Sequence, residues 1–390
     1  MIDRIAADPL KCTGCGACAA ICPTENIIMD YSREGFLMPS IGTKCIDCKL
    51  CQKRCPANKP VELHPMLEAW AASSVDKAEI LNGCTSGGVA FELSREVIDR
   101  GGVVFGACFS EDCLTVHHCA ANELDQLQKF KGSKYIQSEP RNCYQETKTA
   151  LKEGKVVLYT GTPCQIAGLY SFLGKEYENL FTMDFMCHGI MSTFAYQSFL
   201  KSIKLHLPIK KITFRSKEQG YCLESPIIIT DSKECEYRSP WIQSLLGIGF
   251  ANNLLSRESC SICQYASCKR AADLTVADFI DTSNSEEENR SGVSLVTVNT
   301  KKGGEMLYNI EKNLEIRALD LDFIKTYKHF AAPAEKHKNR DAFFDQIDSL
   351  PYNVLAQKYF TPYEPCFSIS KLGKKLIKKM RKIAKIIIRK

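Results

Sequence analysis

The stretch CTGCGACAAICP, residues 12–23, decides the fold of the N-terminal part of the chain. The same cysteine spacing recurs in CIDCKLCQKRCP, residues 45–56. Each run places three cysteines two residues apart, then a fourth cysteine three residues later, with a proline directly after it. Gly14 and Gly16 allow the tight turns that this close spacing requires. The chain therefore opens with two matching runs of metal-binding cysteines.

This spacing is typical of 4Fe-4S clusters, because three thiolates of one run wrap one corner of a cube while the fourth reaches over to the other cube. We predict two 4Fe-4S clusters. One is held by Cys12, Cys15, Cys18 and Cys55, and the other by Cys45, Cys48, Cys51 and Cys22. A zinc knuckle is the alternative, since paired cysteines also suit tetrahedral zinc. Clusters of this kind move single electrons without substrate chemistry, so the rest of the chain must supply their destination.

The length and composition favour a globular protein of more than one domain. The chain has 390 residues, of which 45% are apolar and 25% charged, and 21 are cysteines. These values exclude long-range disorder for most of the chain. No apolar run approaches the ~18 residues that span a bilayer, and residues 1–4 open no signal peptide. We therefore expect a cytoplasmic protein, whose reduced cysteines bind metal and form no disulfides.

The net charge of +6 hides an uneven distribution. Residues 371–390 carry ten Lys or Arg and no acid, which leaves residues 1–370 at −4. A nucleic-acid-binding domain would carry its basic surface on the folded body, so this class is disfavoured. Between residues 369 and 387, apolar residues recur every three or four positions, which predicts a basic amphipathic helix and possible peripheral contact with an anionic membrane. Docking on the core, solvation, or binding to a partner protein are the alternatives.

The remainder of the chain has the pattern of an α/β protein, changing to α+β in its second half. Strands are predicted at 101–109, 155–161, 179–185, 211–214, 227–230, 272–279 and 294–298, and helices at 89–97, 163–173 and 192–205. Alternating strands and helices imply a largely parallel sheet with binding sites at the carboxyl ends of its strands. The predicted organisation is a ferredoxin-like domain at 1–60, a linker at 61–80, a larger mixed-sheet domain at 81–345, and a C-terminal segment at 346–390.

Three loops and four cysteines of the body are candidate site residues. The loops 85–88, 131–135 and 161–164 combine glycine with Ser, Thr or Lys at helix starts, a pattern that suits an anionic pyrophosphate, although such loops are also common as plain turns. The cysteines are Cys164, Cys187, Cys260 and Cys263, and Cys268 is a spare that could replace one of them. Four thiolates could hold a third cluster. Other body cysteines, including Cys108, Cys113, Cys119 and Cys143, are expected to be small buried apolar residues.

Residues 82–280 resemble the beta-subunit family of coenzyme F-420 hydrogenases and dehydrogenases. The resemblance is carried by the order and spacing of these stretches: Ser86–Gly88, Gly101–Gly106, Lys131–Ser138, Gly161–Gln165, Cys187–Gly189, Phe214–Arg215, Arg257–Cys263 and Ala272–Thr275. The chain departs from the family pattern at Cys84-Thr85, where a serine-rich run is usual, and at 276–280, which replaces a Gly-Asp-Phe-Trp-Gly end.

The resemblance implies a flavin, normally FAD, in the body. It places around the flavin Ser86, Gly87, Gly88, Lys131, Gly132, Ser133, Lys134, Tyr135 and Gln137. It also favours a third 4Fe-4S cluster on Cys164, Cys187, Cys260 and Cys263. His188 is a candidate proton donor, although capping of a strand end would also explain it.

The predicted function is that of an iron–sulfur flavoprotein oxidoreductase, which passes electrons between 4Fe-4S clusters and a flavin and exchanges hydride with a small-molecule acceptor. Its partner is that acceptor or a redox partner protein. The first alternative is a flavin-free adaptor subunit that links ferredoxin to a partner oxidoreductase. The second is a redox-sensing regulator whose basic tail binds nucleic acid.

Overall fold

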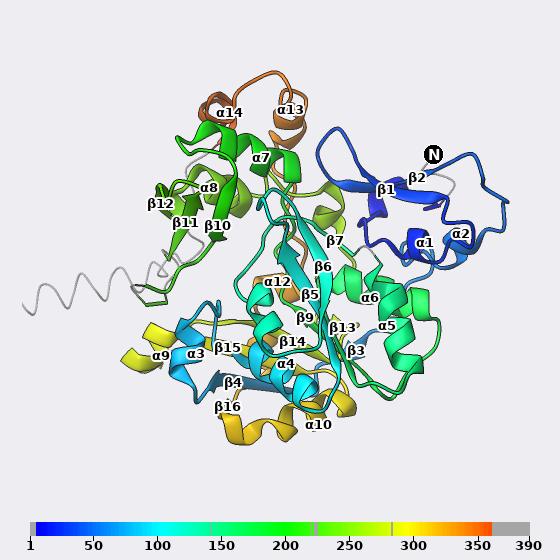
Figure 1. Cartoon of the computed structure of the whole chain (residues 1–390), viewed down its shortest axis with the longest axis vertical. Helices are drawn as coiled ribbons and strands as arrows, with labels where there is room; N and C mark the ends of the chain where they lie inside the picture. The colour runs from blue at the N-terminus through cyan, green and yellow to red at the C-terminus, as the bar shows by residue number, and fades with distance from the viewer. Residues whose placement is uncertain (1–4, 141, 219, 222–224, 282–283, 361–390) are drawn as a thin grey trace, which may run out of the picture. The chain divides into compact units, whose positions relative to one another are not determined.

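Nine strands form one mixed sheet in the body (Figure 1). The computed structural model describes residues 5–140, 142–218, 220–221, 225–281 and 284–360, and the basic helix predicted at 369–390 lies outside them. In sheet order, the strands are β16 (Leu314–Ala318), β4 (Glu68–Ser74), β15 (Val293–Val298), β14 (Leu274–Phe279), β9 (Leu180–Phe185), β8 (Val157–Thr160), β5 (Val103–Phe109), β6 (Val116–Ala121) and β7 (Ser138–Glu139). The central strands β14, β9, β8 and β5 are parallel, whereas β4, β15 and β16 pair antiparallel with their neighbours. Strand β6 pairs antiparallel with β5 and parallel with β7.

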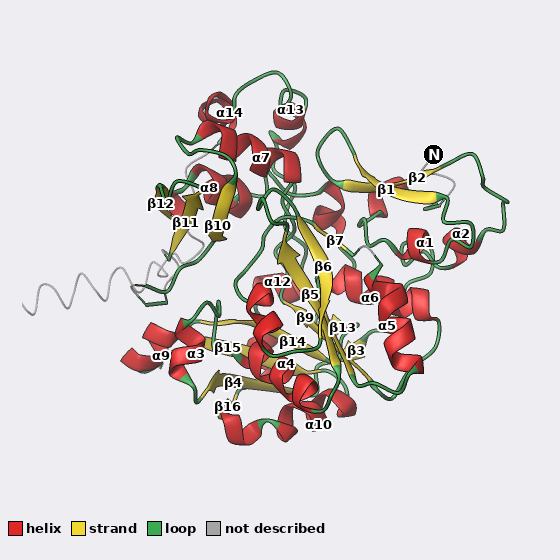
Figure 2. Cartoon of the chain, viewed as in Figure 1, coloured by secondary structure: helices red, strands yellow, loops and turns green. Residues whose placement is uncertain are grey.

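Helices cover both faces of this sheet (Figure 2). They include α4 (Val89–Asp99), α5 (Cys143–Lys152), α6 (Pro163–Leu173) and α10 (Lys301–Asn309). Side chains alternate along each strand, so Phe105 packs with α5 and α6 while its neighbour Val104 packs with α4. Both faces are therefore apolar, as expected for the interior strands of an α/β sheet.

A separate three-stranded sheet supports a second core. Its strands are β10 (Ile209–Thr213), β11 (Pro226–Asp231) and β12 (Glu236–Pro240). It packs with the helices α7 (Thr193–Ser202), α8 (Leu245–Ala251), α13 (Arg340–Phe344) and α14 (Tyr352–Tyr359). Aromatic side chains such as Phe199, Trp241 and Tyr352 fill this core.

The N-terminal part contains a small hairpin and two short helices. The hairpin joins β1 (Ile27–Tyr31) to β2 (Leu37–Ile41), and the helices are α1 (Ala17–Ala20) and α2 (Leu50–Lys53). Each helix contains the third cysteine of one run, Cys18 in α1 and Cys51 in α2. The remaining elements are β3 (His64–Pro65), β13 (Lys269–Arg270), α3 (Lys77–Leu81), α9 (Glu286–Ser291), α11 (Leu321–Lys325) and α12 (Lys328–Ala331).

The predicted fold class, α/β with a mixed sheet and antiparallel strands in the second half, is confirmed. The structure adds β4, which lies inside the predicted linker 61–80 and pairs with β15 and β16. Likewise, α14 lies within the predicted C-terminal segment, yet Tyr352 and Leu355 are buried in the second core. In the part of the chain described here, no helix is long and apolar enough to cross a membrane.

Candidate functional site

Four cysteines drawn from both N-terminal runs line one pocket, which we call site 1. They are Cys12, Cys15, Cys18 and Cys55. Gly16 takes the left-handed φ of 80° just before α1, which lets the chain turn between Cys15 and Cys18. Burial, together with the nearby Cys12 and Cys55 thiols, raises the pKa of the Cys15 thiol to about 12. Such a group keeps its protons until cations replace them, so its donor set fits an iron–sulfur cluster.

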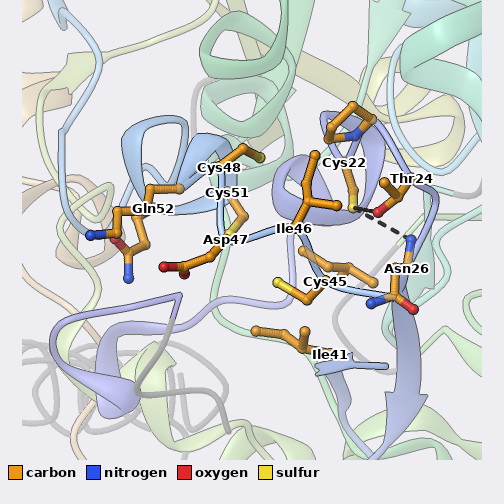
Figure 3. Close-up of a pocket in the computed structure, with 13 residues that line it drawn as sticks. Cys22, Thr24, Asn26, Ile41, Cys45, Ile46, Asp47, Cys48, Cys51 and Gln52 are labelled. Atoms are coloured by element: carbon orange, nitrogen blue, oxygen red, sulfur yellow. Dashed lines mark hydrogen bonds between the residues drawn. The ribbon is translucent and has the colours of Figure 1, made fainter. Parts of the chain in front are cut away.

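The other four cysteines of the two runs line site 2 (Figure 3). They are Cys22, Cys45, Cys48 and Cys51. Cys22 Sγ accepts a hydrogen bond from the Asn26 N–H at 3.4 Å and lies 3.5 Å from Thr24 Oγ1. Although burial opposes the shift, these hydrogen bonds lower the pKa of the Cys22 thiol. The structure thus brings together the two sets of four that the spacing predicts, each combining three cysteines of one run with the last cysteine of the other.

Site 3 is a pocket in the body at the carboxyl ends of β8 and β9. Its four cysteines are Cys164, Cys187, Cys260 and Cys263. Cys164 is the second residue of α6, whose first turn is fixed by a hydrogen bond from the Thr162 N–H to Gln165 Oε1 at 3.1 Å. Cys187 follows β9, and the last two cysteines lie on and directly after the 3-10 turn Glu258–Ile262. Three separate segments therefore converge on one group of thiols.

Burial is the largest cause of the raised thiol pKa values in site 3. It raises the pKa of Cys164 to about 11 and that of Cys260 to about 12, and in each case neighbouring cysteines of the site add to the shift. The pKa of Cys187 is raised well above its ordinary value for the same reasons. As in site 1, the buried thiols need cations to become thiolates, which is the chemistry of a metal-cluster site.

Sites 1 and 3 have a common wall. Thr13 and Tyr265 line both pockets. In α6, a Cβ added at Gly168 would lie 3.0 Å from Cys15 Cβ and 3.1 Å from its Sγ, so the helix backbone touches a site 1 cysteine. The Tyr144 hydroxyl lies 2.8 Å from both Cys15 O and Gln165 O and shares its one proton between these two carbonyls. The N-terminal part and the body therefore meet where the two cysteine sites approach each other.

Arg257 joins the same two sites and was not predicted as a site residue. It lines site 3, is only 5% exposed, and donates from Nε to Cys12 O at 2.9 Å. Its Nη1 donates to Leu37 O at 2.9 Å, and its Nη2 lies 3.8 Å from Cys12 Sγ. The sequence signal was its place three residues before Cys260, at the start of one of the stretches that carry the family resemblance. A buried guanidinium thus lies beside a site 1 thiol while it borders site 3.

His188 lies in the wall of site 3 and has a partner for each ring nitrogen. Nδ1 is 3.1 Å from His329 Nε2, and Nε2 is 3.3 Å from Phe250 O. Burial lowers the pKa of His188, and burial with the nearby His188 lowers the pKa of His329 to about 4. Both imidazoles are therefore neutral near pH 7. The proton-donor role of His188 stays a prediction, with His329 as its neighbour.

The loops 83–88 and 131–135, which we call the basic loop pair, face each other. Ser133 Oγ donates to Thr85 Oγ1 at 3.1 Å, and Lys131 Nζ donates to Asn82 O at 3.0 Å and forms an ion pair with Glu79. A Cβ added at Gly132 would meet only Gly83 O, at 3.8 Å. Another group could therefore approach the backbone at Gly132 closely, as the pyrophosphate of a flavin would need to do.

Two cationic side chains that were not predicted as site residues border this region, Lys217 and Arg215, the second of which belongs to a stretch that carries the family resemblance. Lys217 Nζ donates to Ser86 O and Ser291 O, each at 2.6 Å, and burial lowers its pKa to about 8. Arg215 pairs with Asp278 at 2.6 Å and lies 3.5 Å from the hydroxyl of Tyr135. Arg215 and Lys217 lie just after β10. Two cationic residues spaced two positions apart after a strand were the signal that the sequence offered for them.

Three other residues that the resemblance places around the flavin contact other parts of the chain. A Cβ at Gly87 would lie 2.4 Å from Ala72 O, so this glycine permits packing against β4. Lys134 Nζ donates to the carbonyls of residues 130, 131 and 132 and so holds its own loop together. The Gln137 side chain accepts from Leu37 N at 2.8 Å, at the contact with the N-terminal part. Cys268 is 3.5 Å from Phe330 O and does not line site 3.

Two family models match this chain. Residues 154–322 match the C-terminal region of the coenzyme F-420 hydrogenase/dehydrogenase beta subunit, and residues 11–59 match a 4Fe-4S dicluster domain. An uncharacterised protein of Methanocaldococcus jannaschii is 27% identical over 209 residues, which cover 44% of this chain and 56% of that relative's length. An uncharacterised ferredoxin of the same organism is 36% identical over 58 residues, which cover 15% of this chain and 75% of the ferredoxin.

A solved structure of the F-420-reducing NiFe hydrogenase complex from Methanosarcina barkeri contains a similar chain, with a TM-score of 0.47 and 19% identity over 76% of this chain and 91% of that one. The family models account for both the cysteine-rich N-terminal part and the core of the body. The body of this chain is therefore similar to the coenzyme F-420 hydrogenase/dehydrogenase beta-subunit family over residues 154–322, and its N-terminal part carries a 4Fe-4S dicluster domain over residues 11–59.

Proposed function

We propose that this protein is an iron–sulfur flavoprotein oxidoreductase with three 4Fe-4S clusters and one FAD, acting on a small-molecule acceptor. The observation that carries the proposal is the presence of three pockets, each lined by four cysteines, two of which share Thr13 and Tyr265 as wall residues. A wall shared by sites 1 and 3 suits electron transfer, because it brings the two groups of thiols close together. Bound clusters would supply one-electron transfer, and bound FAD would exchange single electrons with them and hydride with the acceptor.

The side chains around sites 1 and 3 hold these sites in place. Tyr144 ties the Cys15 backbone to α6 through its two hydrogen bonds. Arg257 supplies a positive charge next to the Cys12 thiol. A buried cation stabilises added negative charge, so Arg257 favours the reduced form of whatever site 1 holds.

The basic loop pair is the proposed flavin site. Lys131 and Lys217 would offset the pyrophosphate charge, the Ser133 hydroxyl would donate to it, and Gly132 would allow its close approach. The Tyr135 ring stacks on Trp241 with centroids 4.9 Å apart, which offers an aromatic wall beside the loops. Gly87 and Gln137 are left out of this proposal because their neighbours lie elsewhere.

Site 2 is the proposed entry point for electrons from a cytoplasmic redox partner protein. Cys45 and Cys48 are exposed, and the Ile46 side chain between them is 64% exposed. A cluster close to the protein surface can exchange electrons with another protein, and an exposed apolar side chain beside it suits a transient contact with that protein.

The test is to purify the full chain anaerobically and to quantify iron, acid-labile sulfide and released flavin on one sample. We expect about twelve irons and one FAD per chain, at four irons for each cluster. A Cys164→Ser/Cys260→Ser variant should lose about four irons, whereas Cys143→Ser, which changes a buried cysteine outside the three sites, should lose none. About eight irons without flavin in the unaltered protein would instead identify a flavin-free electron-transfer adaptor.

A further inference from the structure

A fourth group of metal-ligating side chains lies on the β5–β6 hairpin, outside sites 1 to 3. It consists of Cys108, His117 and Cys119. Cys108 Sγ is 2.8 Å from Cys119 Sγ and 3.4 Å from His117 Nε2. The three ligand atoms all lie within 4.8 Å of one another. The sequence predicts both cysteines to be small buried apolar residues. Cys108 is buried, and both cysteines lie beside the same histidine, which the sequence does not indicate.

The register of the hairpin explains how the three side chains meet. Cys108 is directly opposite His117, and Cys119 is directly opposite Gly106. Side chains two residues apart on a strand share a face, so all three point to the same side of the sheet. Gly106 has no side chain to fill the place opposite Cys119, so the Cys119 thiol can lean toward Cys108. Phe130 closes this face, since a Cβ at Gly106 would lie 2.9 Å from its ring.

This arrangement suits an ion better than a disulfide. The two cysteines occupy diagonal positions of an antiparallel pair, which lie about 7–8 Å apart. A disulfide needs Cα atoms within about 4.4–6.8 Å, so a direct bond would strain the hairpin. An ion between the sulfurs adds two bonds of about 2.3 Å and spans the diagonal without backbone movement.

We propose that Cys108, His117 and Cys119 form a zinc site. Two thiolates and one imidazole are the donor types that zinc prefers, with a water molecule in the fourth position. At bond lengths of about 2.3 Å to sulfur and 2.0 Å to nitrogen, the ligand atoms would stand roughly 3.5–3.8 Å apart. The Cys108–His117 separation of 3.4 Å is within about 0.1 Å of this range, and the two thiols, 2.8 Å apart, would move apart by about an ångström.

The charges around the group are compatible with this ion. Lys129 and Lys134 are close enough to Cys119 to interact with it electrostatically. Their ammonium groups donate to backbone carbonyls, Lys129 to Ala120 O at 2.8 Å and Lys134 to three carbonyls of its own loop. Two thiolates neutralise Zn²⁺, so the loaded site adds no net charge next to these lysines. The ion would fix the hairpin beneath the loop 131–135.

The test uses the full chain purified anaerobically with its iron–sulfur clusters, incubated with Zn²⁺ and then freed of loosely held metal by a chelator column. Mass spectrometry of the metals should find about one zinc per chain in addition to the iron. A Cys108→Ser/Cys119→Ser variant should lose this zinc and keep its iron. The matched control is Cys113→Ser, which changes a buried free thiol in the turn between the same two strands and should keep both metals.

Zinc K-edge X-ray absorption of the unaltered protein provides a second measurement that does not depend on the folding of a variant. We expect two sulfur ligands and at least one imidazole nitrogen around the ion. The proposal is overturned by a protein that retains no zinc, by a variant that keeps it, by a coordination shell of four sulfurs, or by a Cys108–Cys119 disulfide in the purified protein. None of these outcomes depends on the presence of flavin or of the third cluster.

Discussion

Replacing Arg257 should make the group held at site 1 harder to reduce. The guanidinium is 5% exposed, with Nη2 at 3.8 Å from Cys12 Sγ and Nε at 2.9 Å from Cys12 O. An Arg257→Met variant removes this positive charge while it keeps an apolar stem of similar length. Because reduction adds an electron to the site, the loss of a nearby cation raises the free energy of the reduced form.

The size of the effect follows from the distance. Two unit charges 3.8 Å apart interact with about 4 kcal/mol at an effective dielectric constant of about 20. If the four thiolates share the added electron, Cys12 takes roughly a quarter of it, which leaves about 1 kcal/mol. For a one-electron couple this energy corresponds to a shift of about 50 mV to lower potential.

The assay is a redox titration of the purified protein, followed by electron paramagnetic resonance at low temperature. Arg257→Lys keeps the charge and should retain most of the potential, while Arg33→Gln removes an exposed arginine and should leave the potential unchanged. Iron content is measured on every variant, because the carbonyls of Cys12 and Leu37 lose a donor in Arg257→Met. An unchanged potential in Arg257→Met with full iron content would refute the electrostatic reasoning.

Three further predictions concern other parts of the chain. Gly168→Val should reduce the iron content of sites 1 and 3, because the added side chain collides with Cys15 and with the Tyr144 hydroxyl, 2.8 Å from the new Cβ. Iron analysis checks it, with the helical Gly304→Ala as the control, whose new Cβ makes only ordinary contacts of 3.4 Å and longer. Flavin binding should weaken as the pH rises through about 8, where Lys217 loses its charge. A Lys217→Arg variant stays charged, so this rise in the dissociation constant should disappear. If the variant and the unaltered protein show the same pH profile, Lys217 does not act on the flavin in this way. Deletion of residues 369–390 should abolish co-sedimentation with anionic liposomes, and unchanged binding would exclude the membrane contact.

The cysteine sets were predictable because cluster ligation leaves a local signature. Fixed spacing within each run determined which side chains share site 1 and site 2, so no knowledge of the tertiary fold was needed. Site 3 is different, since its cysteines come from α6, from the end of β9 and from a turn far along the chain. Their places at a helix start, after a strand and in a Cys-x-x-Cys pair made them candidates, and the resemblance to a known family favoured them as one group. The topology that brings them together became visible in the structure.

Features that depend on cross-strand register were not predictable in this way. Cys108 and Cys119 lie in separate strands, and the pairing of those strands depends on the whole sheet. In the sequence, the apolar residues near each cysteine make both look like ordinary core residues. Strand β4 was missed because the residues before it, rich in proline and charge, resemble a linker. Arg257 and Lys217 contact backbone carbonyls of distant segments, and neither the family stretch around Arg257 nor the charges after β10 indicate which carbonyls those are.

The Tyr144 hydrogen bonds and the Gly168 contact have a kinetic consequence. A ferredoxin that diffuses freely must collide with its partner for every electron, so its rate depends on concentration and on ionic strength. With the proposed clusters at sites 1 and 3, the carrier is covalently joined to its acceptor, so passage between these two sites would be intramolecular. Dilution and added salt should then leave this passage unchanged and act only on encounters with separate molecules, such as the arrival of the partner protein at site 2.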